Sequence, residues 1–283
     1  MPSHVTICPQ VLNNSISKDS VALTHLQLCE PYNAWRGDQP VDVKRFPYGA
    51  LVNDILVVAD LHLGYEDALR ERGVELPYEQ YPWIKKEILR YLDEYNPEIV
   101  VLNGDIKHEF GGALSQEWRE VLDLLRTLKS RGIKIEVVRG NHDNYLIPIL
   151  LREGIEIKDP YLVIDGIMFF HGHKDLLAVP EGVELIVMGH EHPAIALMDD
   201  LGGSHRFKAF LEGKYLDIRL LVIPALSPLA PGTDIIKVGK ESLLSPLLRR
   251  AELDEFTVYI ADEEVGVEML GPLRVIKRAA RVL

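Results

Sequence analysis

Five short apolar segments of this sequence each run directly into a polar cluster that contains histidine or aspartate. The clusters are DLH (60–62), NGDIKH (103–108), RGNHD (139–143), HGH (171–173) and GHEH (189–192). The apolar segments that precede them are typical of buried strands: ILVVA, IVVLN, IKIEVVR, IMFF and LIVM. Because ligands bind at the carboxyl ends of strands in an open α/β sheet, five such placements predict one shared site at a sheet edge.

Two helical patterns separate the first of these strands. Residues 83–95 carry an apolar stripe with Pro97 close behind it, and residues 115–132 carry a second stripe that ends at a glycine. Alternation of strand and helix predicts an α/β fold with parallel pairing in this half of the chain. The later strands, which include residues 218–224, have little helix between them, and this favours antiparallel pairing or a second sheet. We expect residues 271–283 to form a solvated or edge-docked end.

The first 45 residues differ from the rest of the chain. They mix Asn, Ser, Pro and Gly without a sustained apolar period, so we interpret residues 1–45 as an extension of unknown role. Residues 46–283 then form the main domain, with its core motifs within 55–225. Two His-x3-Cys repeats in the extension could bind zinc or could arise by chance, and both readings stay open; their residues are His4, Cys8, His25 and Cys29.

The charge and cysteine content exclude several classes of protein. The chain has 31 Lys and Arg against 43 Asp and Glu, a net charge of −12, which disfavours passive binding of nucleic acid through clustered cations. An enzyme that meets phosphate through bound metal ions is not excluded. Two cysteines make no disulfide framework, and we see neither a signal peptide nor a membrane span. We therefore expect a soluble cytoplasmic protein with no membrane partner.

The composition of the five clusters indicates bound metal. A single Asp after a strand is usually a turn former, and a single buried His is usually a satisfied core residue. Many polar groups buried at one edge would be costly without a partner that satisfies them. Imidazole, carboxylate and amide oxygen ligands suit first-row divalent ions, and five clusters suit two ions about 4 Å apart, bridged by Asp105. Two such ions clamp the oxygens of a phosphoryl displacement, so the predicted chemistry is phosphoester hydrolysis.

The ordered set of clusters resembles the calcineurin-like metallophosphoesterase superfamily over roughly residues 50–225. The resemblance implies a four-layer α/β/β/α sandwich of two facing mixed sheets. It also implies two divalent ions, with Mn the first choice and Fe, Zn, Ni or Co as alternatives. A narrower similarity, carried by ADLHLGYE, ELP, GDIKHEF and IPALSPLAPGTD, is to the archaeal and bacterial ICC-like phosphoesterases, which include the ligase-associated PdeM type.

The resemblance also implies a role for individual residues. The first metal would be held by Asp60, His62 and His192. The second would be held by Asn141, His171 and His190, with Asp105 shared between the two. His142 would protonate the leaving oxygen, Asp143 would orient His142, and Arg139 would position the phosphate or be an ordinary strand-end arginine. His108 and His173 would contact phosphate or support the ligands.

The leading interpretation is therefore a two-metal phosphodiesterase that acts as a nuclease on DNA or RNA, with DNA-repair or nucleic-acid-processing proteins as partners. The alternative is a phosphodiesterase or phosphatase for a small molecule such as a nucleotide, to which the acidic composition is better suited. A third reading is a catalytically silent scaffold with the same fold. Because every ligand position is filled, the sequence favours an enzyme over a scaffold.

Overall fold

The computed structural model describes residues 41–111, 115–198 and 202–280. The predicted extension therefore lies outside the described residues except for 41–45, and the His-x3-Cys repeats lie outside them entirely. The elements are β1 (Val43–Phe46), β2 (Gly49–Val52), β3 (Ile55–Val58), α1 (Tyr65–Glu71), α2 (Tyr81–Tyr95), β4 (Ile99–Asn103), α3 (Ser115–Ser130), β5 (Lys134–Val138), α4 (Ile147–Arg152), β6 (Ile157–Lys158), β7 (Tyr161–Ile164), β8 (Ile167–Phe170), β9 (Leu185–Met188), β10 (Pro193–Met198), β11 (Ser204–Tyr215), β12 (Ile218–Val222), β13 (Thr233–Asp234), α5 (Pro246–Arg250), β14 (Thr257–Asp262), β15 (Gly266–Pro272) and α6 (Leu273–Ala280).

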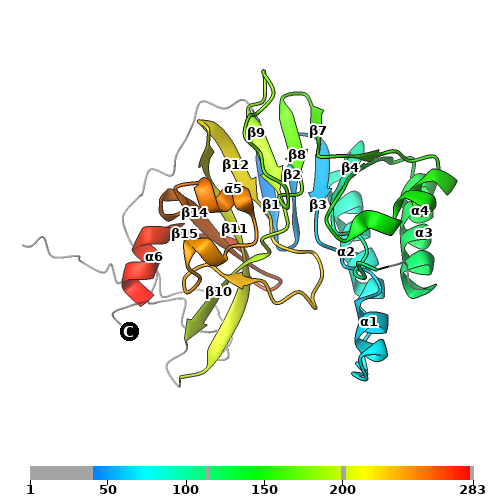
Figure 1. The fold of residues 1–283 in the computed structure, drawn as a ribbon, viewed down its shortest axis with the longest axis horizontal. Coiled ribbons are helices and arrows are strands. Elements are labelled where there is room, and N and C mark those ends of the chain that lie inside the picture. Colours follow the sequence, from blue (N-terminus) through cyan, green and yellow to red (C-terminus); the bar gives the residue numbers. More distant parts are fainter. Residues whose placement is uncertain (1–40, 112–114, 199–201, 281–283) are drawn as a thin grey trace, which may run out of the picture.

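Two mixed sheets face each other and carry helices on their outer sides (Figure 1). The first sheet has the order β1-β2-β3-β4-β5-β6, in which β3 to β6 are parallel, as predicted for the first half. The second has the order β13-β10-β11-β12-β9-β8-β7, and β14 pairs with β11 and β15. In the second sheet β8, β9 and β12 are parallel and β11 is antiparallel to β12. The predicted four-layer sandwich is confirmed.

Strands at the centre of both sheets are buried on both faces, which explains their uninterrupted apolar sequences. In β3, Leu56 and Val58 pack toward α2 and α3, whereas Val57 packs between the two sheets. In β8, Phe169 faces the inter-sheet core and Phe170 faces the opposite side. Because side chains alternate along a strand, each apolar run supplies two layers of core at once.

The outer layers come from two pairs of helices, α2 with α3 in the first half of the chain and α5 with α6 near its carboxyl end. α2 and α3 pack on the first sheet through an apolar stripe that includes Ile84, Ile88 and Leu124. α5 and α6 cover the second sheet. Of the carboxyl-terminal residues that we expected to be solvated or docked at an edge, Leu273–Ala280 form α6, whose Leu273 and Ile276 are buried. In the described part of the chain, no helix combines the length and the apolar character that a bilayer span requires.

The side chain of Asn103 connects the two sheets. It lies at the end of β4, fully buried, and its Nδ2 donates hydrogen bonds to the carbonyls of Phe170 (3.4 Å) and Val187 (3.1 Å) on the second sheet. In the opposite direction, the Nδ1–H of His171 donates to the carbonyl of Asn103 at 2.9 Å. This exchange fixes the spacing of the sheets at the edge where the polar clusters emerge.

The Asn103 contacts lead to a prediction about stability. Asn103→Ala removes the donor to two buried carbonyls, so the free energy of unfolding should fall by about 1–3 kcal/mol. Denaturant titration of wild type and variant would measure the difference. Asn144→Ala, at an exposed position, is the matched control and should change stability little; equal effects of the two substitutions would contradict the inter-sheet role.

Candidate metal centre

The five polar clusters meet at one edge of the sandwich. They follow β3, β4 and β5 of the first sheet and β8 and β9 of the second. Two groups of three side chains bring their ligand atoms within 4.8 Å of one another. One group is Asp60, His62 and His192, and the other is Asp105, His171 and His190. The sequence assigned the first group as the structure has it; for the second ion it assigned Asn141, His171 and His190, with Asp105 shared between the two ions.

The two groups of side chains lie next to each other. His171 Nε2 lies 3.3 Å from Asp105 Oδ2 and 3.9 Å from Asp60 Oδ1, so it stands between the carboxylates of both groups. His192 Nε2 lies 2.9 Å from the same Asp60 oxygen. Since each carboxylate faces imidazole nitrogens from the opposite sheet, the arrangement suits two neighbouring cations rather than two separate sites.

The backbone that presents these side chains is strained. Asp60, His62, Asp105, His190 and His192 all have φ between 46° and 66°, in the left-handed region that non-glycine residues avoid. Each such residue costs about 1–3 kcal/mol and persists only where its surroundings hold it. Five of them at one site indicate that the fold accepts strain in order to aim these side chains.

Two glycines allow the clusters to approach each other. A Cβ atom on Gly104, which has φ of 88°, would lie 2.3 Å from His171 Nδ1. A Cβ atom on Gly140 would lie 2.1 Å from Asp105 Oδ1. Both positions therefore require glycine for steric reasons, in addition to its usual role in ending a strand.

Asp143 holds the backbone around Asp105. Its buried carboxylate accepts hydrogen bonds from the backbone amides of Asp105 (2.8 Å), Ile106 (2.9 Å), Lys107 (3.4 Å) and Gly140 (2.8 Å). Burial, together with the nearby Asp105 carboxylate, raises the pKa of Asp143 to about 6. The sequence interpretation gave Asp143 the role of orienting His142; in the described residues its partners are these amides instead, because the chain turns back under the Asp105 loop.

The carbonyl of His108 orients His142. His142 Nδ1 contacts this carbonyl, which can only accept, so the neutral ring carries its proton on Nδ1 and leaves Nε2 free. Nε2 lies 3.8 Å from Asp105 Oδ2 and therefore faces the candidate centre. This direction agrees with the predicted role in proton transfer.

Arg139 is engaged elsewhere. Its guanidinium pairs with Asp159 at 3.0 Å and donates to Asn144 Oδ1 at 2.6 Å, and no contact within the described residues joins it to the histidines. The sequence left two roles open for Arg139, a phosphate contact or an ordinary arginine at a strand end. Its contacts in the structure are those of an ordinary arginine at a strand end.

The remaining predicted residues lie around the two groups. Asn141 Oδ1 is buried and has no hydrogen-bond partner among the described residues. The ring of His173 lies 5.3 Å from that of His171 and 6.1 Å from that of His190. His108 joins His62 and His142 in a third group whose ligand atoms lie within 4.8 Å. The structure thus brings Asn141, His108 and His173 to the same region as the other ligands.

Charge is distributed so that the carboxylates stay ionised and most imidazoles stay neutral. Burial would raise the pKa of Asp60 and Asp105, but neighbouring imidazoles outweigh it and hold both below the usual value. Burial lowers the pKa of His62 and of His190 to about 3. His171 is the exception: burial opposes its charge, but Asp105 and Asp60 raise its pKa to about 10. Apart from His171, which a bound cation would deprotonate, these are the protonation states that divalent ions require.

The unpaired polar atoms fit bound metal. Among the described residues, the buried atoms without a hydrogen-bond partner include His62 Nδ1, His108 Nδ1, Asn141 Oδ1 and His173 Nδ1. Buried polar atoms are normally paired, and several orphans at one place indicate a missing partner. Nitrogen and oxygen donors without cysteine suit Mn, Fe, Zn or Co. The donor set therefore fits two divalent cations.

A hydrogen-bonded network that the sequence did not reveal supports the first group. Gln80, fully buried, donates to the carbonyl of His62 at 2.7 Å and accepts from Ser227 Oγ at 2.6 Å. Ser227 N in turn donates to the carbonyl of Asp60 at 3.1 Å. Lys208 Nζ donates to the carbonyls of Ala225 (2.5 Å) and Ser227 (2.7 Å). In the sequence, Ala225 and Ser227 belong to the segment IPALSPLAPGTD. That segment contributed to the narrower resemblance, but no physical role for it followed from the sequence alone.

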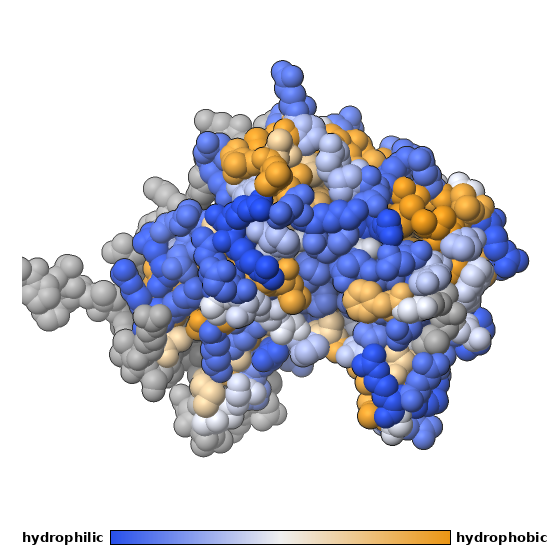
Figure 2. Space-filling model, in the orientation of Figure 1, coloured by the Kyte–Doolittle hydropathy of each residue, from blue (hydrophilic) through white to orange (hydrophobic). Residues whose placement is uncertain are grey.

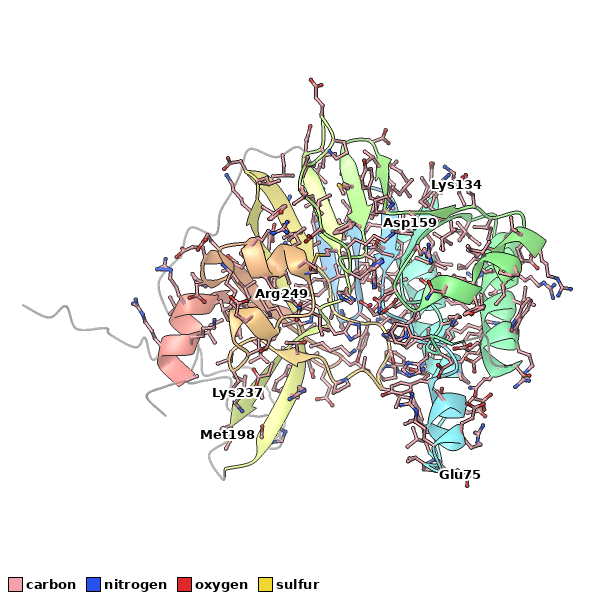
Figure 3. All side chains as sticks on the ribbon, in the orientation of Figure 1. Glu75, Lys134, Asp159, Met198, Lys237 and Arg249 are labelled. Carbon is pink, nitrogen blue, oxygen red and sulfur yellow. The ribbon has the colours of Figure 1, made fainter. Side chains whose placement is uncertain are left out.

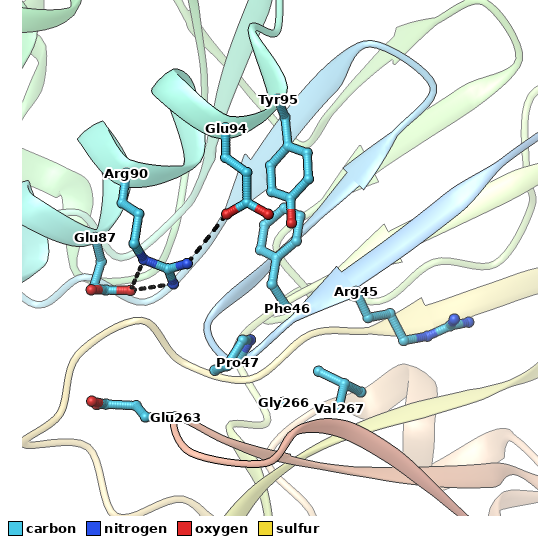
Figure 4. A pocket seen from close by; sticks show the side chains of 10 residues that line it. All are labelled: Arg45, Phe46, Pro47, Glu87, Arg90, Glu94, Tyr95, Glu263, Gly266 and Val267. Atoms are coloured by element: carbon cyan, nitrogen blue, oxygen red, sulfur yellow. Dashed lines mark hydrogen bonds and ion pairs between the residues drawn. The ribbon is translucent and has the colours of Figure 1, made fainter.

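A separate pocket of about 400 Å³ lies away from these residues (Figure 4). It is bounded by β1, by α2 and by the turn between β14 and β15. Of the two arginines that line it, Arg90 is already paired with Glu87 at 2.7 Å and with Glu94 at 3.5 Å, and Arg45 is paired with Glu212. Because both cations are already engaged by carboxylates, this pocket is a weaker candidate for chemistry than the metal centre.

Comparison with known proteins agrees with this geometry. A family model described as calcineurin-like phosphoesterase matches residues 54–218. The crystal structure of Pseudomonas putida nuclease MPE is similar at 18% identity and a TM-score of 0.53, over 81% of this chain and 99% of that chain. YfcE, a phosphoesterase from E. coli, is 17% identical with a TM-score of 0.38, over 75% and 90%. Wild-type Vps29 complexed with zinc, from Entamoeba histolytica, is 14% identical with a TM-score of 0.32, over 77% and 99%. No curated protein matches the sequence.

The Gln80 network leads to a prediction about metal affinity. Gln80→Ala releases the carbonyl of His62, so divalent affinity should fall roughly 10- to 100-fold, as it does when groups that orient metal ligands are removed. Titration calorimetry with Mn²⁺ would measure the change. Gln116→Ala, at another buried glutamine that bonds Glu120, is the matched control; an equal loss of affinity in both variants would contradict a specific role for Gln80.

The buried Glu120 leads to a prediction about pH. Its carboxylate accepts from Gly64 N at 2.9 Å, and burial raises its pKa to about 7 from an ordinary value of 4.5. A folded-state pKa that is raised means that folding favours the protonated form, so the contribution to stability is full at low pH and is lost as pH rises through about 7. Glu120→Gln should therefore flatten the fall in unfolding free energy between pH 4.5 and 7, measured by denaturant titration with chelator present. Glu268→Gln, at an exposed position, should leave the slope unchanged.

Proposed function

The chain belongs to the calcineurin-like phosphoesterase family, and on that premise we propose that it is a two-metal phosphodiesterase that cleaves nucleic acid. As a family member it is a hydrolase that acts on phosphoester bonds, and the family is typically dependent on a dinuclear metal centre. We propose Mn²⁺ as the first choice of metal and proteins of nucleic-acid processing as partners.

One observation carries the proposal: the two groups of candidate ligands are in contact with each other. His171 Nε2 is within 3.9 Å of the carboxylates of both groups. We assign Asp60, His62 and His192 to one cation and Asn141, His171 and His190 to the other, with Asp105 between them. When bound, such a pair of cations neutralises charge on the phosphoryl oxygens and lowers the pKa of a water molecule.

His142 supplies the protein's own proton-transfer group. Its Nδ1–H is held by the carbonyl of His108, so the ring cannot rotate away from the centre. Its Nε2 faces the site and, in the charged ring, presents a proton to the leaving oxygen. Asp143 does not touch the substrate in this scheme; it fixes the Asp105 loop through four backbone amides.

The surface around the centre suits a chain-like substrate. α1 begins three residues after His62, and β10 begins directly after His192, so two projections diverge from the ligand loops. Their far parts are marked by Glu75 and Met198 in Figure 3, and Figure 2 shows a hollow between them. Such a hollow can accept a polymer that passes across the metals. The similar structure of Pseudomonas putida nuclease MPE and the narrower resemblance to ICC-like phosphoesterases of the PdeM type also favour a nuclease.

A small phosphodiester or phosphate monoester is the second candidate. It is favoured by the net charge of −12, because a small substrate needs only the metals and few protein cations. The silent scaffold is disfavoured, because the predicted ligand side chains converge and His142 Nε2 faces them.

We expect Mn²⁺-dependent cleavage of labelled single- or double-stranded DNA or RNA. Asp105→Ala removes the carboxylate between the groups and should abolish cleavage. His142→Ala should lower kcat about 10²- to 10⁴-fold with metal content unchanged, because the lost group transfers a proton. Gel assays with metal analysis of each variant would measure both effects.

The control for this experiment is Lys134→Ala (Figure 3), which alters an exposed residue at the amino end of β5, opposite the strand ends that carry the candidate ligands, and it should cleave like wild type. Hydrolysis of bis(p-nitrophenyl) phosphate without cleavage of any polymer would contradict the nuclease and support the second candidate. Full metal content with no hydrolysis of diester or monoester would contradict enzymatic function altogether.

A further inference from the structure

Three aromatic rings line one side of the candidate centre. The ring of Tyr65 stacks on that of His108, with centroids 3.8 Å apart and planes inclined by 20°. The ring of Phe110 lies 3.6 Å from that of His142, inclined by 34°. The His108 ring lies 5.4 Å from that of His62, so the three rings of Tyr65, His108 and Phe110, here called the aromatic ledge, adjoin the metal ligands.

Core packing explains only part of the ledge. Tyr65 and His108 are partly buried against each other, as aromatic side chains in a protein commonly are. Phe110 differs, because 49% of its surface is exposed although its ring already touches the residue assigned to proton transfer. An apolar ring that is half in water beside a reactive group has a face available to a substrate.

The backbone that carries Phe110 is fixed, so the ledge is in place before a ligand arrives. Glu117 Oε1, on α3, accepts from the amides of His108 (3.0 Å) and Glu109 (2.6 Å). Glu109 Oε1 accepts from Gly111 N at 3.1 Å. A surface that is ordered in advance loses little entropy on binding.

We propose that the aromatic ledge stacks against the nucleobase on the leaving-group side of the scissile phosphate. The inference rests on the proposed function and adds the class of group recognised. His142 Nε2 faces the leaving oxygen in that function, and Phe110 covers the His142 ring, so the base attached through that oxygen lies nearest to Phe110.

Stacking on aromatic rings is compatible with the acidic composition. Every base has a flat face, and its stacking on an aromatic side chain is tolerant of sequence and requires no cation on the protein. Loss of one such stack by alanine substitution corresponds to roughly 5- to 150-fold in affinity. A chain of net charge −12 can therefore hold a nucleic acid through bases and bound metals instead of through clustered Lys and Arg.

The test uses thymidine dinucleotides with Mn²⁺ and the full chain. Three substrates are compared by kcat/KM: one with both bases, and two in which one or the other base is replaced by an abasic tetrahydrofuran. The product that retains the phosphate identifies the leaving side. Wild type should lose roughly 5- to 150-fold when the leaving-side base is absent and should change little when the other base is absent.

Phe110→Ala and removal of the leaving-side base together form a double-mutant cycle, which measures the contact between the Phe110 ring and that base. Phe110→Ala should lose the same factor on the complete dinucleotide and nothing further on the leaving-side abasic substrate, whereas Phe110→Tyr should keep wild-type behaviour. Tyr145→Ala, which alters another aromatic residue that is 50% exposed, is the matched control and should resemble wild type.

Two results would overturn the stacking proposal and leave the proposed nuclease function intact. One is equal wild-type kcat/KM on all three substrates. The other is an equal loss by Phe110→Ala with and without the leaving-side base, which would indicate a purely structural role. If wild type hydrolyses bis(p-nitrophenyl) phosphate but cleaves neither dinucleotides nor longer polymers, the nuclease proposal fails and the stacking proposal fails with it.

Discussion

The exchange of hydrogen bonds around Asn103 is the contact on which the rest of the site depends. Ligands come from both sheets, so their distances are set by how the sheets sit against each other at this edge. Asn103 donates to carbonyls of β8 and β9, and its own carbonyl receives the Nδ1–H of His171. One residue therefore sets the separation of the sheets and also selects the His171 nitrogen that faces the carboxylates.

Backbone pairing beyond the strand ends offsets the strain of the ligand loops. Asp60 N donates to Gly104 O and His62 N donates to Asp105 O, both at 3.0 Å, which continues the β3–β4 pairing into the loops. Asp143 supplies a further acceptor for the amides beside Asp105. The left-handed residues are thus held by bonds on their own backbone, which leaves their side chains free to point at a common centre.

The sequence predicted the fold, and it identified candidate ligands that the structure brings together, because each of them follows a buried strand and strand ends are local signals. It could not predict which carbonyl orients His142 or that Arg139 pairs with Asp159, since these contacts join segments whose relative positions only the folded chain defines. The same holds for Gln80 and Ser227, which are 147 positions apart and meet only beneath the Asp60 loop. Side chains that act on a distant backbone leave no periodic pattern in a sequence.

The division of the ligands between two sheets has a consequence for how the protein is made. All strands of the first sheet precede all strands of the second along the chain. A growing chain therefore presents Asp60, His62 and Asp105 well before His171, His190 and His192 exist to complete either group. The loop that braces Asp60 through Ser227 is synthesised later still. The full set of candidate ligands therefore exists only after His192 has been synthesised, and a metal held by both groups would be captured after the ligand loops of both sheets have been translated.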